Sequence, residues 1–210
     1  MDHDILLTNY IHKNVFSQGE IDLIYSGIDL NEKKQTTTVD LYAQKVWFIN
    51  LPEKIKDTVT KLARGIYQQN VNLEEISFAR YSKEYGQFPN LTPHYDNTFL
   101  EQRVTIDVQL RSNIDWPIVI QGREFTLKDN EALTFSGTHQ VHWRKNQIFK
   151  DDDFIEMLFC HFSLEDKKII TIEDKIKIEK RMMEFSNKFS VDLIKQLDSY
   201  KNAIKGYTYE

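Results

Sequence analysis

The part of the sequence that most constrains the fold is a succession of short β-type runs between Glu75 and Phe162. Each run is rich in β-branched or aromatic residues, and the runs read ISFARYS, RVTIDVQL, PIVIQ, REFTL, ALTFSG, QVHWR and FIEMLFCHF. Turn-type clusters such as RSNID, QGR and KDNE separate them. Short strands divided by such turns are typical of an antiparallel sandwich or barrel. We therefore predict a mainly β fold with helices packed outside it.

Two structured segments are expected before the β region. Ser17 and Glu20 have the spacing of a capping box, which predicts a short helix that ends at about Gly27. Residues 37–49 are rich in β-formers and predict one early strand.

A second helix should begin at Pro52 and reach about Gln69, because apolar residues recur there at helical spacing. Its buried face would consist of Ile55, Val59, Leu62 and Ile66. Residues 172–189 also have a helical pattern, and Ser190 can cap a last helix that ends at Gly206.

We expect the 210 residues to form a single domain, since a typical domain holds about 100–200 residues. Residues 1–70 would supply the N-terminal strand and supporting helices, residues 71–165 the β core, and residues 166–210 the C-terminal helices. These last helices would either pack on the core or join two copies in a homodimer.

The composition argues against several classes of protein. The net charge is −5, and 27 basic residues are scattered among 32 acidic ones, so no basic stripe indicates nucleic-acid binding. A single cysteine, Cys160, excludes an internal disulfide and a cysteine-based zinc site, and favours a reducing compartment. No run of about 18 apolar residues and no leader pattern occurs. We expect a cytoplasmic protein without a membrane or nucleic-acid partner.

Three residues have the pattern of a metal site. His94 and Asp96 are two positions apart, so on an extended chain both side chains leave the same face. His142 in QVHWR is the predicted third ligand. Two imidazoles and one carboxylate leave open positions on an octahedral Fe(II), as oxygen activation requires. A His-x-Asp triplet also occurs by chance, so the residues alone leave open that the pair is incidental.

His139 is the alternative to His142, since it lies only three positions earlier. It follows Gly137 and Thr138 in a turn-type stretch, whereas Val141 and Trp143 place His142 in a strand. We therefore predict His142 as the ligand.

The order of motifs in residues 80–162 resembles a known family. Arg80-Tyr81 precedes Gly86, and His94-Tyr95-Asp96 follows. This stretch resembles the double-stranded β-helix, a jelly-roll or cupin-like core, of the 2-oxoglutarate and Fe(II)-dependent dioxygenases, especially their prolyl-hydroxylase-like branch. The resemblance implies an oxidoreductase that uses Fe(II), 2-oxoglutarate and O₂, and releases succinate and CO₂. It implies hydroxylation of a protein side chain or small molecule, because Asp96 leaves no vacancy for a halide.

The resemblance also assigns cosubstrate contacts. Tyr81 matches the strand tyrosine that hydrogen-bonds the distal carboxylate of 2-oxoglutarate, although it could equally be a packing residue. Gln109 matches a position in the same pocket, on one face with Thr105 and Asp107.

The usual basic anchor of the family is missing, because Asp152 stands ten residues after His142 and the last β run has no Arg or Lys. Arg144 should face inward beside His142, and we predict it as the replacement, since a guanidinium matches a carboxylate bidentately. The alternative is a salt bridge from Arg144 to Asp107 or Glu156. Secondary candidates for a carboxylate are Arg80, Arg103 and His161.

Two loops should flank the mouth of the site. Residues 82–92 and 145–153 form these loops, and we predict Tyr85 and Trp143 as substrate contacts. Two other functions remain open, namely a non-catalytic cupin-like barrel that binds a metal or ligand and a structural partner protein. Only the dioxygenase needs Tyr81, Gln109 and Arg144 as a carboxylate pocket beside the metal.

Overall fold

The computed structural model describes residues 9–28, 36–39, 43–67, 70–86, 91–94, 96, 102–137, 140–164 and 180. Within these residues the chain is mainly β, with two antiparallel sheets and two α-helices, as the sequence predicted. The predicted C-terminal helices, and any homodimer contact through them, lie outside the described residues. No described helix combines the length and the apolar character needed to span a membrane.

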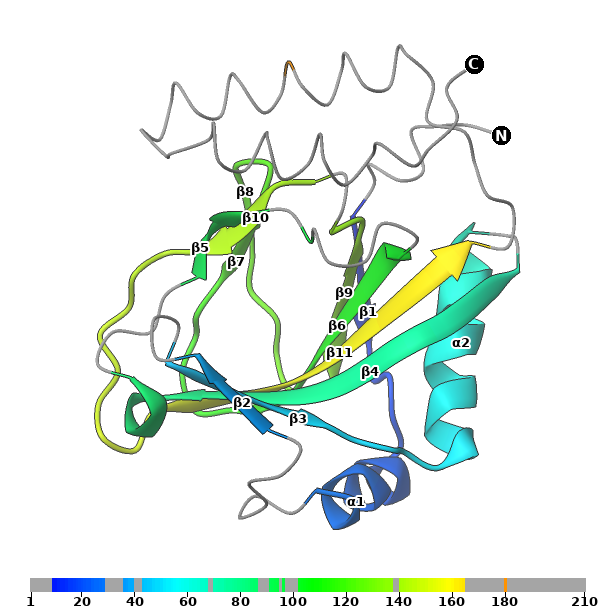
Figure 1. Cartoon of the computed structure of the whole chain (residues 1–210), viewed down its shortest axis with the longest axis horizontal. Helices are drawn as coiled ribbons and strands as arrows, with labels where there is room; N and C mark the ends of the chain where they lie inside the picture. Colours follow the sequence, from blue (N-terminus) through cyan, green and yellow to red (C-terminus); the bar gives the residue numbers. More distant parts are fainter. Residues whose placement is uncertain are drawn as a thin grey trace.

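The larger sheet has the strand order β1-β9-β6-β11-β4-β3-β2. Its strands are β1 (Tyr10–Lys13), β2 (Thr36–Val39), β3 (Gln44–Phe48), β4 (Val71–Ser82), β6 (Gln102–Ser112), β9 (Glu131–Phe135) and β11 (Phe154–Leu164). The smaller sheet has the order β5-β10-β7-β8. Its strands are β5 (Leu91–His94), β7 (Ile118–Ile120), β8 (Arg123–Phe125) and β10 (His142–Arg144). Figure 1 shows the smaller sheet and the two helices on different sides of the long strands β4, β6 and β11.

The long strands divide the core into two clusters because successive side chains of a strand point to opposite faces. On β11, Leu158 and Phe162 belong to the outer cluster, which the helices cover. Ile155 and Met157 of the same strand belong to the inner cluster, between the two sheets. The functional residues described below lie on the inner side.

Helix α1 (Gln18–Ser26) begins and ends where the sequence predicted. The carboxylate of Glu20 accepts hydrogen bonds from the backbone N–H of Ser17 at 2.8 Å and from its hydroxyl at 2.6 Å. The hydroxyl bond and then the backbone bond lower the pKa of Glu20 to about 2. Gly27 caps the C-terminal end.

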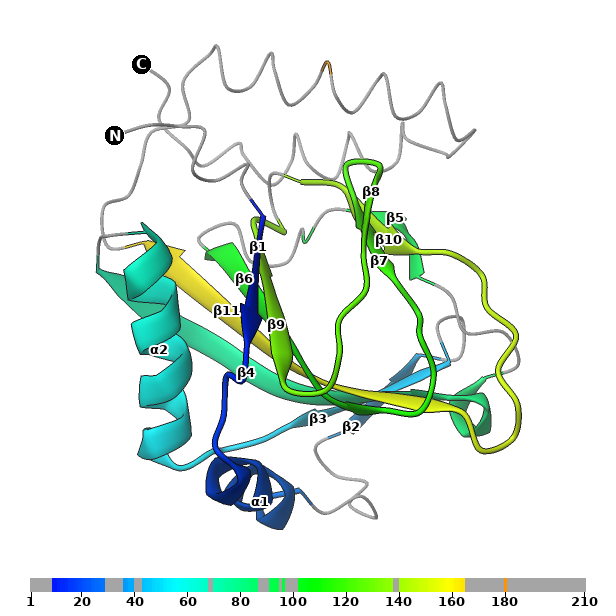
Figure 2. The same ribbon diagram turned by 180° about the vertical axis from the view of Figure 1, so that it is seen from behind.

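Helix α2 (Glu53–Tyr67) follows Pro52 and packs on the outer cluster, next to the large sheet in the view from behind (Figure 2). Ile55 and Val59 are buried as predicted, but the buried face continues through Ala63 and Tyr67. Leu62 and Ile66, which the sequence placed on this face, pack at its margin.

The prediction of a single strand over residues 37–49 is wrong. The chain instead forms two antiparallel strands, β2 and β3, that pair with each other. Ala43 precedes β3 with a φ of 49°, in the left-handed region. Alanine is not a typical residue for this conformation, so residue 43 carries no turn signal.

Candidate metal centre

The three predicted ligands come together at one end of the small sheet. His142 on β10 is the direct cross-strand partner of His94 on β5, and their ring centroids are 4.2 Å apart. The Oδ1 atom of Asp96 lies 3.7 Å from Nε2 of His94 and 3.4 Å from Nε2 of His142. One donor atom from each residue lies within 4.8 Å of the other two, so the triad could hold a single metal ion. His139 lies outside the described residues.

The ring of His142 is oriented by the backbone. Its Nδ1 atom lies 3.0 Å from the carbonyl oxygen of Gln140, which positions the proton on Nδ1 and leaves the Nε2 lone pair facing Asp96. Gln140 is fully buried, and its side-chain oxygen accepts a 2.9 Å bond from the backbone N–H of Ser136. This support is typical of a histidine ligand, whose second nitrogen usually donates to a carbonyl or carboxylate.

Asp96 is held in a space that only a glycine leaves open. Its backbone N–H donates to the carbonyl of Gly137 at 2.9 Å, and its Oδ2 atom lies 3.5 Å from the hydroxyl of Thr105. A Cβ atom on Gly137 would lie 1.7 Å from this Oδ2 and 2.9 Å from the Thr105 hydroxyl. The carboxylate therefore occupies the place of a Gly137 side chain, and the donor set fits a divalent metal.

The two histidines keep the carboxylate of Asp96 ionised. Burial alone would raise the pKa of Asp96, but His142 and then His94 lower it more, so the pKa lies below its ordinary value. Burial alone would lower the pKa of His142, but Asp96 raises it above the ordinary value. Asp96 is consequently ionised at neutral pH, as a metal ligand must be.

A cavity of about 190 Å³ adjoins the triad. Its apolar walls are Leu91, Ile118, Phe135 and Phe159. Its other polar lining comes from Gln44, Tyr81, Thr105, Asp107, Arg144 and His161. Sequence reasoning missed Gln44, which is the cross-strand partner of Tyr81 and donates from Nε2 to the Tyr81 hydroxyl at 2.8 Å. Gln44 reaches the cavity because β3 pairs with β4, and the sequence did not predict this pairing.

Arg144 lies in this cavity and is only 5% exposed. Its guanidinium donates to the carbonyl of Trp116 and lies 5.0 Å from the Trp116 ring centroid and 5.9 Å from that of Tyr81. Among the described residues it forms no ion pair. The guanidinium is thus buried without a carboxylate partner, which is costly unless an anion binds beside it.

The alternative prediction, a salt bridge from Arg144 to Glu156, is wrong. Glu156 faces the outer side of the large sheet, where its carboxylate binds Arg80 at 2.6 Å, Arg111 at 3.1 Å and the Tyr25 hydroxyl at 2.7 Å. No salt bridge joins Arg144 to Asp107 either, among the pairs of the described part of the chain. Arg80, a secondary candidate for a carboxylate ligand, is consequently taken up by Glu156. Side chains alternate between the two faces along β4, so Tyr81 points inward and Arg80 points outward.

Other predicted site residues do not line the cavity. Gln109 lies two positions beyond Asp107, and its amide donates to Asp129 at 3.4 Å. Trp143 sits between His142 and Arg144 on β10, and alternation turns it away from the cavity that both neighbours line.

Tyr85, in the 3-10 helix Lys83–Tyr85, packs on the outer cluster with its ring centroid 6.2 Å from that of Trp47. Of the remaining candidates, His161 does line the cavity, with Nδ1 3.5 Å from the Thr105 hydroxyl. The side chain of Arg103 lies outside the described residues.

Solved structures of known proteins share this fold. No protein-family model and no curated protein sequence matches the chain. An oxidoreductase of the 2OG-Fe(II) oxygenase family from Burkholderia pseudomallei is similar at a TM-score of 0.54 and 11% identity, over 75% of this chain and 84% of its own. A Pseudomonas putida prolyl-4-hydroxylase has a TM-score of 0.54 at 10% identity, over 77% of this chain and 96% of its own.

A third similar structure, HygX from Streptomyces hygroscopicus, was solved with nickel and 2-oxoglutarate bound. Its TM-score is 0.51 at 12% identity, over 75% of this chain and 83% of its own. The resemblance found in the sequence is therefore confirmed at the level of the fold, which this chain shares with 2-oxoglutarate and Fe(II)-dependent oxygenases that include prolyl hydroxylases.

Proposed function

We propose that this protein is a 2-oxoglutarate and Fe(II)-dependent dioxygenase with a double-stranded β-helix core. The observation that carries the proposal is the pairing of a metal triad with a buried, unpaired guanidinium in one cavity. His94, Asp96 and His142 would hold the iron, and Arg144 would bind the distal carboxylate of 2-oxoglutarate. The fold shared with oxygenase structures supports this assignment.

Each residue of the cavity has a distinct role in this proposal. Iron, when bound, supplies the activation of O₂ that is coupled to decarboxylation of 2-oxoglutarate to succinate and CO₂. Gln44 donates to the hydroxyl oxygen of Tyr81 and would orient this hydroxyl, to which we assign a hydrogen bond to the distal carboxylate beside Arg144. Ile118 and Phe135 keep water from the cosubstrate, which strengthens the electrostatic contacts inside the cavity.

Hydroxylation is the reaction we favour, because Asp96 occupies the ligand position that a halide would need. The substrate would be a small molecule or a protein side chain. The fold alone does not decide between them, because one fold can serve enzymes with different substrates and reactions. The non-catalytic barrel is not favoured, because the similar solved structures named above are oxygenases and hydroxylases. A structural partner protein would have no need of the buried guanidinium beside the triad.

Anaerobic addition of Fe(II) and 2-oxoglutarate tests the proposal. Chelation of iron by the keto acid should produce a visible charge-transfer band, and His142→Ala should abolish it. His12→Ala is the matched control, since His12 lies on β1, outside the cavity, and the band should persist. Folded wild-type protein without the band would overturn the assignment.

A further inference from the structure

Asp107 is a buried carboxylate in the cavity that the proposed function does not use. It lies on β6, is 6% exposed and lines the cavity together with the triad and Arg144. Within the described part of the chain it makes no hydrogen bond and no ion pair. Both cross-strand neighbours are apolar, Phe159 on β11 and Leu133 on β9. The sheet therefore gives this carboxylate no polar partner.

An ionised carboxylate away from water is unfavourable unless a cation or hydrogen-bond donors compensate it. Burial raises the pKa of Asp107 to about 7, so that ionisation is incomplete at neutral pH when the cavity holds no cation. A positive group placed against the carboxylate would favour its ionised form. Asp107 is accordingly suited to bind a cation that enters the cavity.

The charges of the cavity indicate where this cation comes from. Apart from the ligand Asp96, Asp107 is the one carboxylate of the described lining, and Arg144 is its one guanidinium. The proposed function assigns Arg144 to the distal carboxylate of 2-oxoglutarate. The cosubstrate is itself an anion, so it adds negative charge and cannot compensate Asp107. The positive charges of Fe(II) and Arg144 would be balanced by Asp96 and the dianionic 2-oxoglutarate, so none is left over for Asp107. The remaining ligand, the substrate, is left to supply the positive group.

We propose that the substrate carries a primary ammonium or guanidinium group that pairs with Asp107. The inference rests on the proposed function, because Arg144 must be occupied by the cosubstrate. A charged nitrogen donates several hydrogen bonds, and a guanidinium matches a carboxylate with two parallel ones. The group would be the side-chain cation of a free basic amino acid, or of a Lys or Arg residue in a protein.

Matched pairs of probes test this inference without turnover. The protein is loaded with Ni(II) and 2-oxoglutarate, and binding of L-arginine is compared by ligand-observed NMR with binding of L-citrulline, which is isosteric but has an uncharged side chain. L-lysine and L-norleucine form a second pair. We expect the cationic member to bind about tenfold to a hundredfold more tightly, because this is the gain in affinity that one charge-assisted hydrogen bond provides. The N-acetyl amides of the same residues separate the sources: preference for these forms indicates a protein side chain, and preference for the free forms a small molecule.

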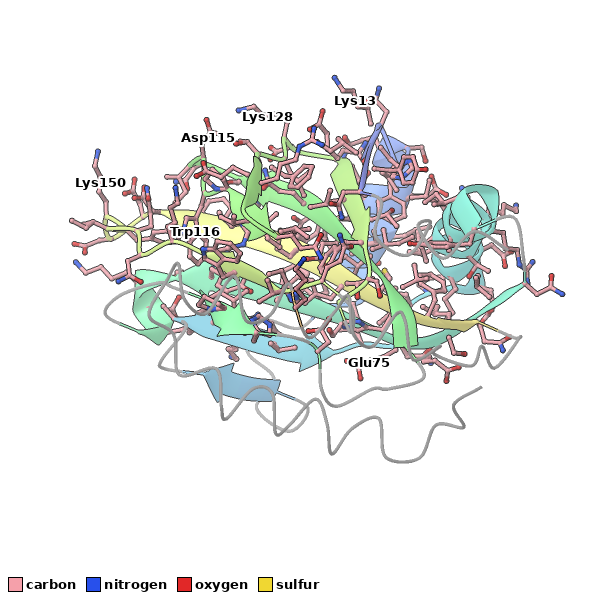
Figure 3. All side chains as sticks on the ribbon, turned by 90° about the horizontal axis from the view of Figure 1, so that it is seen from above. Lys13, Glu75, Asp115, Trp116, Lys128 and Lys150 are labelled. Atoms are coloured by element: carbon pink, nitrogen blue, oxygen red, sulfur yellow. The ribbon has the colours of Figure 1, made fainter. Side chains whose placement is uncertain are left out.

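Substitutions then locate the preference. Asp107→Asn keeps the shape but removes the charge, and should bring the two members of each pair to equal affinity. Asp107→Glu, which keeps the charge, should retain the preference. Asp115→Asn is the matched control, because Asp115 projects outward beside Lys128 and pairs with it at 2.8 Å (Figure 3). Equal binding within both pairs in the wild type, or an unchanged preference in folded Asp107→Asn, would overturn the inference.

Two further titrations separate this inference from the proposed function. Binding of 2-oxoglutarate to the Ni(II)-loaded wild type is measured alone, and the arginine and citrulline pair is repeated without the cosubstrate. Failure of 2-oxoglutarate to bind would overturn the proposed function, whereas the contrast between arginine and citrulline reports on Asp107 in either case.

Discussion

Gly137 and Asp96 lie so close that a Cβ atom on Gly137 would be 1.7 Å from the Oδ2 atom of Asp96. This distance is far below any van der Waals contact, and the backbone hydrogen bond between the two residues at 2.9 Å prevents their simple separation. Gly137→Ala should therefore displace the carboxylate from the triad. We expect a loss of metal affinity of about tenfold or more, measured by titration with Ni(II) or Co(II), since one ligand of three is misplaced.

Gly65→Ala is the matched control for this change. Gly65 lies within α2, and nothing stands within 4 Å of the added Cβ. The variant should bind metal as the wild type does and be more stable by about 1 kcal/mol, because alanine is the better helix former. If Gly137→Ala and Gly65→Ala bind metal with equal affinity, a Cβ atom at position 137 does not disturb the metal site.

Arg144→Ala should weaken 2-oxoglutarate binding much more than Tyr81→Phe. The first change removes the cation and its two hydrogen bonds to the carboxylate, whereas the second removes one hydrogen bond from a neutral donor; each hydrogen bond to a charged group is worth about 1.5–3 kcal/mol. Calorimetric titration of 2-oxoglutarate into the Ni(II)-loaded variants measures both. Arg123→Ala is the control, since Arg123 is an exposed residue of β8 outside the cavity. If the two cavity variants lose equal affinity, Arg144 is not the anchor.

Glu156→Ala should destabilise the protein without affecting the metal centre. The carboxylate is fully buried and binds Arg80, Arg111 and Tyr25 on the outer side of the sheet, so its removal leaves a partly buried Arg80 without its counter-ion. Loss of one partner of a buried ion pair costs about 3–5 kcal/mol. Chemical denaturation measures the free energy of unfolding, and Ni(II) titration measures the site. A large fall in metal affinity of the folded variant would contradict the separation of the two faces.

Glu20 makes the stability of α1 depend on pH. Its pKa is lowered from the ordinary 4.5 to about 2, chiefly by the hydroxyl and backbone of Ser17, so the native state favours the ionised form. The resulting stabilisation is complete above the unfolded pKa and is lost as the pH falls from about 4.5 to about 2. Glu20→Gln should thus be less stable than the wild type at pH 7, by about 1 kcal/mol. Unfolding curves at several pH values should show this difference disappear in acid, and a difference that persists at pH 2 would refute the explanation.

Much of the fold could be predicted because its signals are local. The β runs, the capping box of Ser17 and Glu20, and the helix after Pro52 all depend on residues that are near one another in the sequence. The spacing of His94 and Asp96 is local too. The supports of the site could not be predicted in this way. Gly137 and Gln140 act on ligands only after β5 and β10 have paired.

Two predicted site residues do not line the cavity, for different physical reasons. Trp143 was predicted to contact the substrate, yet its place between His142 and Arg144 on one strand already requires the opposite face. Strand alternation alone indicates this orientation. Gln109 shares its predicted face with Asp107, and it misses the cavity because the space ends before it. The extent of a cavity depends on the opposing sheet, which no local pattern specifies.

The position of β11 in the larger sheet has a consequence for the order of folding. β11 is the last described strand along the chain, yet it lies between β6 and β4 in the sheet. Until residues 154–164 leave the ribosome, β4 and β6 each have an unpaired edge, and Asp107 and Tyr81 lie on strands that are not yet joined. Exposed edges of this kind promote aggregation of incomplete chains. The nascent protein is therefore most vulnerable just before β11 emerges from the ribosome, and the cavity can form only afterwards.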